Sequence, residues 1–183
     1  MQNQAVRSLL QVTTVVALAV AATSAPAQQL ASARNATLRT ATSGPALTPA
    51  RAARLSANMK TAEAFENENR FDDASRVYRS IADEQVAAGE YPLEALNRIA
   101  AVNFGIHPYR AAQASMELAA AAAEFGDGTT RLRALFEAAL TWQLIGRRDK
   151  VDESVRQIRP LLKSPAIPEA VRSNIAARLV VGR

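Results

Sequence analysis

The sequence predicts an all-α protein in which antiparallel helix hairpins stack as a short α-solenoid of about seven helices. Three observations support this class. Hydrophobic residues make up 49% of the chain but aromatic residues only 5%, and alanine supplies much of the apolar total, which favours helix packing over strands. Proline and glycine alternate at the expected starts and ends of helices. Apolar positions also recur at an interval of 38 or 39 residues.

Residues 1–27 have the pattern of a secretory signal peptide. Arg7 supplies a positive charge, an apolar run covers residues 12–22, and Ala25-Pro26-Ala27 matches the cleavage pattern of small residues. The run is shorter than the roughly 20 apolar residues of a membrane span, which favours cleavage; a retained anchor is the alternative. We therefore expect an exported protein, periplasmic or secreted and of bacterial type, with no stable membrane span after signal cleavage.

Residues 28–49 predict a flexible linker, because Ala, Ser, Thr and Gln dominate there and Ser43-Gly44-Pro45 would break a helix. The helical domain is expected over residues 50–183. Its first helix begins with Thr48 as a cap and Pro49 in the first turn.

The predicted helix boundaries follow from the positions of proline and glycine residues. Pro92, Pro108 and Pro168 each precede an apolar period, whereas Gly89, Gly126 and Gly146 each follow one. Connections this short force neighbouring helices to run antiparallel, either in a closed bundle or in a stack. The predicted helices cover residues 50–68, 71–88, 92–105, 108–125, 129–145, 148–163 and 167–181.

An internal repeat favours the stack over the bundle. Small residues at matching positions let adjacent helices approach closely, while larger side chains fill the space between layers. The matching columns are Ala62, Ala100 and Ala139; Ala74, Ala112 and Val151; and Tyr78, Met116 and Val155.

The stretch AEAFENENRFDDASRVYRSIA resembles the tetratricopeptide repeat. That repeat has a small residue and an aromatic in its first helix, a glycine at the turn, and an alanine and an aromatic in its second helix. Asn69 takes the place of the turn glycine, which it can do because asparagine also adopts left-handed conformations. The matching residues are Ala62, Phe65, Phe71, Ala74 and Tyr78.

Two further copies depart from the family pattern. The third keeps Gly146 but has Val151 in place of the alanine, and the middle one has Asn103 and His107 in place of the aromatic and the glycine. The period also exceeds the usual length of about 34 residues. The resemblance covers residues 55–163 and implies three degenerate repeats, with the last helix as a solvating cap.

The resemblance implies a groove lined by the first helix of each pair, where proteins of this kind bind a peptide or a partner protein. Phe104, Phe136 and Leu140 are the candidate anchors; the alternative is that they pack against the last helix or a neighbouring layer. The expected function is a non-enzymatic interaction scaffold or adaptor for an envelope or extracellular partner. The groove candidates are Met59, Glu63, Glu66, Asn97, Ala101, Phe104, Phe136, Leu140 and Gln143.

No catalytic, cofactor or metal site is predicted. The chain has no cysteine and a single histidine, His107, which precedes Pro108 and is expected in a turn. Glycine-rich phosphate loops and serine elbows are absent from the sequence. The net charge of +5 is mild, and arginine alternates with acidic residues along the helices, which argues against a nucleic-acid partner.

Two other functions stay open. One is an exported helical enzyme subunit with a carboxylate-based site near Glu63 and Glu66, although the acidic cluster is expected to be a solvated face. The other is a self-associating structural protein.

The alanine run 119–123 is expected to lie between layers, the alternative being an oligomer or membrane contact. The acidic cluster comprises Glu63, Glu66, Glu68, Asp72 and Asp73.

Overall fold

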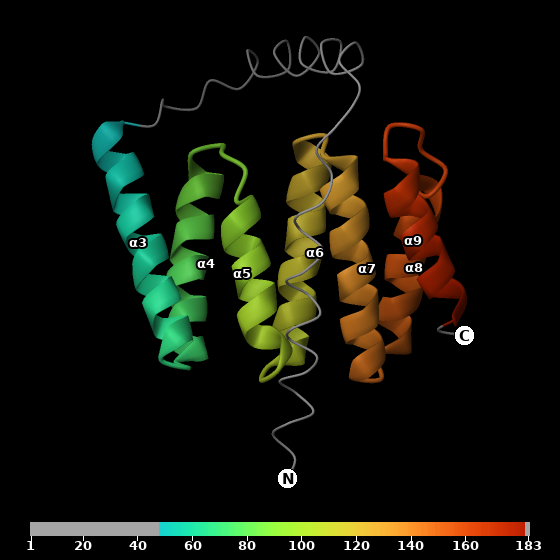
Figure 1. The fold of residues 1–183 in the computed structure, drawn as a ribbon, viewed down its shortest axis with the longest axis horizontal. Coiled ribbons are helices and arrows are strands. Elements are labelled where there is room, and N and C mark those ends of the chain that lie inside the picture. The colour runs from blue at the N-terminus through green and yellow to red at the C-terminus, as the bar shows by residue number, and fades with distance from the viewer. Residues whose placement is uncertain (1–47, 182–183) are drawn as a thin grey trace. The chain divides into compact units, whose positions relative to one another are not determined.

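A computed structural model describes residues 48–181, which form seven α-helices and no strand (Figure 1). The predicted all-α class and seven helices are confirmed, and each predicted boundary lies within two residues of the structural one. The predicted signal peptide, and the predicted linker as far as residue 47, lie outside the described residues. The helices are α3 (Pro49–Asn67), α4 (Phe71–Ala87), α5 (Leu93–Phe104), α6 (Pro108–Glu124), α7 (Gly128–Leu144), α8 (Arg148–Leu161) and α9 (Glu169–Val181).

Side-chain caps begin two of these helices. The Thr48 hydroxyl accepts a hydrogen bond from the Arg51 amide at 3.3 Å, and Pro49 occupies the first turn of α3. The Asp127 carboxylate accepts from the Thr130 amide at 2.9 Å before α7. Each cap satisfies an amide that has no partner within its helix, which explains why the helices start where the sequence predicts.

Residues with a left-handed backbone conformation lie in the hairpin turns. Gly89, Gly126 and Gly146 have φ values of 70°, 71° and 75°, a conformation that glycine adopts without steric cost. Asn69 has a φ of 58° at the corresponding point of the α3–α4 turn, as expected for a residue in the place of a turn glycine.

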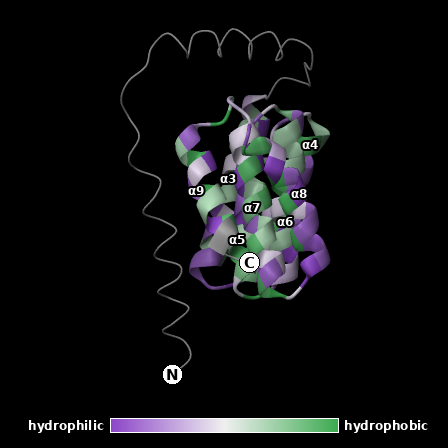
Figure 2. Cartoon of the chain, turned by 90° about the vertical axis from the view of Figure 1, so that its right-hand side faces the viewer, coloured by the Kyte–Doolittle hydropathy of each residue, from purple (hydrophilic) through white to green (hydrophobic). Residues whose placement is uncertain are grey.

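The helices lie side by side in chain order, and each packs against the next one through α8 (Figure 1). Contacts between alternate helices define two layers. Arg98 of α5 pairs with glutamates of α3, whereas Arg79 of α4 pairs with Glu117 of α6 and Ser154 of α8 contacts Met116 of α6. We call α3, α5 and α7, which lie on one side of the array in Figure 2, the odd layer, and α4, α6 and α8 on the other side the even layer. This neighbour-to-neighbour packing is that of a helical solenoid.

Four small residues of the repeat columns are buried in the array, whereas Ala100 and Val151 are partly buried. Ala62, Ala74 and Ala112 are fully buried, and Ala139 is 3% exposed. Larger side chains fill the space between them. They include Tyr78, Ile81, Leu96, Leu118, Leu132, Leu135 and Ile158, all buried. In the alanine run of α6, Ala119 and Ala122 are buried and Ala120 and Ala123 exposed, so one side of the run packs within the array.

Helix α9 packs against α7. Ile167, in the connection before it, and Ile175 within it are 2% and 4% exposed. The Arg178 guanidinium lies 4.8 Å from the centroid of the Phe136 ring. Figure 2, which views the array from the α8–α9 end, places α9 on the odd-layer side.

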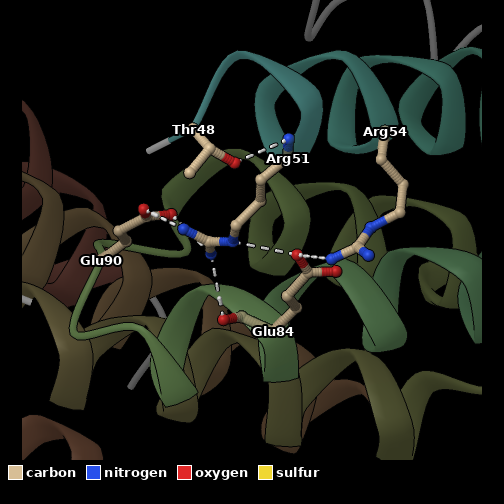
Figure 3. Close-up of polar contacts among 5 residues, drawn as sticks. All are labelled: Thr48, Arg51, Arg54, Glu84 and Glu90. Atoms are coloured by element: carbon tan, nitrogen blue, oxygen red, sulfur yellow. Dashed lines mark hydrogen bonds and ion pairs between the residues drawn. The ribbon is translucent and has the colours of Figure 1, made fainter. Parts of the chain in front are cut away.

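A cluster of ion pairs holds the start of α3 to the end of α4 (Figure 3). Arg51 Nε lies 3.0 Å from Glu84 Oε1, and its Nη1 lies 2.5 Å from Glu90 Oε1. Arg54 reaches the same Glu84 oxygen at 2.6 Å, and together the two guanidinium groups lower the pKa of Glu84. The cluster therefore joins three segments: α3, α4 and the turn before α5. None of the helices in residues 48–181 is long and apolar enough to cross a membrane.

Candidate partner-binding surface

An exposed stripe runs along α7. Arg133, Glu137, Leu140 and Leu144 follow one another at intervals of three or four residues, and all four are exposed. That spacing places them on one side of a helix. Leu132 and Leu135, on the opposite side, are fully buried. Helix α7 therefore turns its core-forming side toward the array and this stripe toward solvent.

Helix α5 has a matching stripe. Glu94, Asn97, Ala101 and Phe104 also follow at intervals of three or four residues and are all exposed. Its buried side includes Leu96 and Ile99, each 3% exposed. Because α5 and α7 both belong to the odd layer, the two stripes run in the same direction.

Along both stripes the residues change from charged or polar to apolar in the same direction. Phe104 and Leu144 are the last residues of their helices, so the apolar half of each stripe lies at the end where the chain turns into α6 and α8. The charged and polar half lies further from these turns. We call the eight residues of the two stripes the odd-layer surface: Glu94, Asn97, Ala101, Phe104, Arg133, Glu137, Leu140 and Leu144.

Large apolar side chains are exposed at the end of this surface where α5 and α7 lead into α6 and α8. Phe104 is 48%, Leu140 38% and Leu144 66% exposed. Ile106 and Tyr109, in and just after the α5–α6 turn, are 44% and 48% exposed. Exposed large apolar side chains that gather on one part of a surface commonly mark an interaction site.

Glu137 lies where the stripe changes from charged to apolar. Its side chain reaches solvent, yet the surrounding helices displace enough water to raise the pKa of its carboxyl group, and Arg133 opposes this shift only in part. Within the described part of the chain, Glu137 takes part in no ion pair with a cationic side chain.

Five of the groove candidates predicted from the sequence are exposed in the odd layer. Asn97, Phe104 and Leu140 belong to the odd-layer surface, as does Ala101. Gln143 is exposed near the end of α7, next to this stripe in the sequence but outside it.

Two candidates are wholly or partly buried instead. Phe136 is only 4% exposed and its ring lies under Arg178 of α9, so it does not present an anchor to solvent. Met59 is half-buried and packs against the core. For Phe136 the structure shows the packing against the last helix that stood as the alternative.

The candidate glutamates are engaged in contacts within the chain. Arg98 Nη2 lies 3.6 Å from Glu63 Oε1, and Arg98 Nη1 lies 3.4 Å from Glu66 Oε2. Tyr78, fully buried, donates a hydrogen bond from its hydroxyl to Glu66 Oε1 at 2.5 Å. Glu66 therefore connects α3 to both α4 and α5.

The rest of the acidic cluster is paired on the surface. Arg70 pairs with Glu68 and with Asp73, and the guanidinium groups of Arg70 and Arg76 lower the pKa of Asp73. Asp72 Oδ1 lies 3.2 Å from His107 Nε2 and 3.1 Å from Arg110 Nη1. The single histidine therefore lies in the α5–α6 turn, as expected, and contacts the start of α4.

An open cleft of about 490 Å³ separates the α3–α4 and α5–α6 turns. Phe71 and Ile106 supply its apolar lining and His107 one of its polar groups. Among the residues that the structure describes, no three His, Asp or Glu side chains come together to hold a metal ion.

Four residues of the odd-layer surface were not predicted from the sequence: Glu94, Arg133, Glu137 and Leu144. Glu137 and Leu144 show why the pattern could have found them. Both follow from Leu140 at helical spacing, three residues before it and four after it, so the pattern of α7 contained the signal. Comparisons of the chain with protein-family profiles, with curated proteins and with solved structures found no match.

Proposed function

We propose that this chain is an exported, non-enzymatic scaffold or adaptor that binds a partner protein through its odd-layer surface. The observation that carries the proposal is the exposure of Phe104, Leu140 and Leu144 at one end of two parallel helices. Covering apolar surface is favourable by about 25 cal/mol per Å², so a partner segment placed there would gain free energy. Export rests on the N-terminal sequence pattern, and the groove on the resemblance to tetratricopeptide repeats.

The carboxylate-based enzyme has less support. A general acid or base needs a carboxyl group that is free to exchange a proton with substrate. Glu66 accepts a hydrogen bond from Tyr78 and pairs with Arg98, and Glu63 pairs with the same arginine. These contacts give both glutamates a role in joining helices.

The test begins with selection of peptides from a displayed random library on the purified full chain. Binding of the selected peptides is then measured by fluorescence anisotropy. Replacing Phe104 and Leu144 together by Ser is expected to weaken binding at least tenfold, because it removes the largest exposed apolar side chains of each stripe.

The matched control is Val86→Ser. Val86 is 61% exposed, but it lies near the end of α4 in the even layer, so this change should leave peptide affinity within twofold. Circular dichroism checks that each variant keeps its helices. Equal loss of binding in the control, or undiminished binding in the double variant, would refute the proposed surface.

A further inference from the structure

Helix α3 buries few apolar side chains for its length. Of its 19 residues only Leu55 and Ala62 are buried, whereas α7 has 17 residues and buries eight. Met59 and Phe65 add partly buried contacts with the core. Segments with few buried apolar side chains open locally at the lowest cost in free energy. Apolar burial therefore holds α3 more weakly than it holds α7.

An open cleft of about 400 Å³ lies along α3 and α4. Phe65 of α3 and Val77 of α4 line it, together with polar side chains of both helices. Side chains that face an open space lose the packing contacts that a neighbouring atom would provide. The cleft thus limits the apolar packing between these two helices.

Polar contacts supply much of what holds the first half of α3. Arg51 Nε and Arg54 Nη2 lie 3.0 Å and 2.6 Å from the same oxygen of Glu84, near the end of α4. Arg51 also lies 2.5 Å from Glu90, and Figure 3 shows its guanidinium group between the two glutamates. The cationic start of α3 therefore lies against the anionic end of α4 and the turn that follows it.

The charges are reversed in the second half of α3. Glu63 and Glu66 both pair with Arg98 of α5, and Glu66 also accepts the hydrogen bond from Tyr78 of α4. Complementary charges across an interface select one arrangement of the two partners. Because its two halves carry opposite charges, α3 matches its neighbours in one direction only.

We infer that α3 is a detachable helix held in place by this electrostatic match, and that ionic strength controls its docking. Raised salt releases α3 while α4 to α9 stay folded. Release uncovers the side of α4 that carries Tyr78, whose hydroxyl group contacts α3 in the docked state. An isolated helix of this length is marginally stable in water, so the released α3 also loses its helical hydrogen bonds.

Salt can act here because solvent reaches most of the charges. The side chains of Arg54, Arg98 and Glu63 are 62%, 39% and 44% exposed, and dissolved ions screen the attraction between exposed charges. The Arg51 side chain is only 16% exposed, so its pairs are screened less. Variants are needed to remove those pairs completely.

The first experiment measures hydrogen exchange by mass spectrometry on the full chain at pH 7, in 20 mM and in 500 mM NaCl. We expect the amides of α3 to exchange at least fivefold faster at the higher salt, and those of α7 to change less than twofold. Protection of α3 that is independent of salt, or equal acceleration in α3 and α7, would overturn the inference.

The second experiment replaces Glu84 and Glu90 together by Gln. In 20 mM NaCl the amides of α3 should then exchange at least tenfold faster than in wild type, with α7 unchanged. The matched control combines Glu117→Gln and Glu153→Gln, which changes the net charge equally and removes ion pairs to Arg79 and Lys150 instead. Faster exchange of α3 in the control, or wild-type exchange in the first variant, would contradict the role of the α3 ion pairs.

Hydroxyl-radical footprinting tests whether release uncovers α4. Oxidation of Tyr78 should increase at least threefold between 20 mM and 500 mM NaCl, relative to Tyr109, which is already 48% exposed. An unchanged ratio would show that α3 stays docked. Helix α3 contributes none of the eight residues of the odd-layer surface, so these results and those of the peptide-binding test are independent of each other.

Discussion

Tyr78 places a hydroxyl group inside the array, where an unpaired polar group would be unfavourable. Its side chain is fully buried, and the hydroxyl donates to Glu66, which in turn pairs with Arg98. Burial, followed by the nearby Glu66 carboxylate, raises the pKa of the Tyr78 hydroxyl above its ordinary value of 10.0. Tyr78 thus belongs both to a repeat column of the sequence and to the core. Through Glu66 it also helps to join α3, α4 and α5.

Replacing Tyr78 by Phe should lower the free energy of unfolding at pH 7 by about 1–2 kcal/mol, because a hydrogen bond to a charged group is lost. It should also change the pH dependence. Above pH 10.0 the unfolded tyrosine ionises while the folded one keeps its proton, so wild-type stability falls as pH rises. That fall should be shallower in Tyr78→Phe, although not absent, because the pKa of Tyr91 is raised as well.

Urea denaturation at pH 8 and pH 11 measures both effects. Tyr109→Phe is the control, because this tyrosine is 48% exposed. Parallel pH profiles for wild type and Tyr78→Phe would show that the buried hydroxyl does not control alkaline stability.

At the scale of elements, the hairpin turns depend on residues with left-handed backbone. Asn69 and Gly146 perform the same task in the α3–α4 and α7–α8 turns, with φ values of 58° and 75°. The α5–α6 turn differs, because Gly105 has a φ of −84° and caps α5 in a right-handed conformation. This turn contains His107 at the position where the repeat pattern expects a glycine.

Asn69→Ala should lower the free energy of unfolding by about 1 kcal/mol, since a Cβ disfavours left-handed backbone and alanine lacks the local hydrogen bonds of asparagine. Asn69→Gly should preserve stability. Gly105→Ala is the control: its φ suits any residue and an added Cβ would meet no atom within 4 Å, so this change should be neutral or stabilising. Thermal unfolding ranks the three variants, and an Asn69→Ala variant as stable as wild type would contradict the role of the turn.

At the scale of the whole molecule, packing between chain neighbours means that stability is distributed along the array. Leu55 lies in the first described helix and is 9% exposed, whereas Ile175 lies in the last one and is 4% exposed. No helix pair brings these two ends of the described chain together. Damage at one end should therefore have little effect on the other.

We expect Leu55→Ala and Ile175→Ala each to cost about 2 kcal/mol through lost burial and the resulting cavity. Hydrogen exchange should accelerate mainly in α3 and α4 for the first, and mainly in α7 and α9 for the second. Ser56→Ala and Ser173→Ala, at exposed positions of the same helices, are the matched controls. Uniform acceleration across all helices in either core variant would show a single cooperative unit instead.

Much of the fold was predictable because its signals are local. Thr48, Gly126 and Gly146 mark helix ends by their own conformational preferences, so all seven helices were located to within two residues. The candidate surface was only partly predictable. Exposure of Asn97, Phe104 and Leu140 follows from the helical period, whereas Phe136 is covered by Arg178, forty-two residues later in the chain.

The sequence by itself determined that this chain is helical, where its helices begin and end, and which residues share a side of each helix, because these properties depend on neighbours within a few residues. Only the tertiary structure decided that α9 lies against α7, that Glu66 is held by Tyr78 and Arg98, and that α5 and α7 lie on the same side of the array. The physical reason is that each of these depends on packing between helices, where side chains distant in sequence compete for the same space.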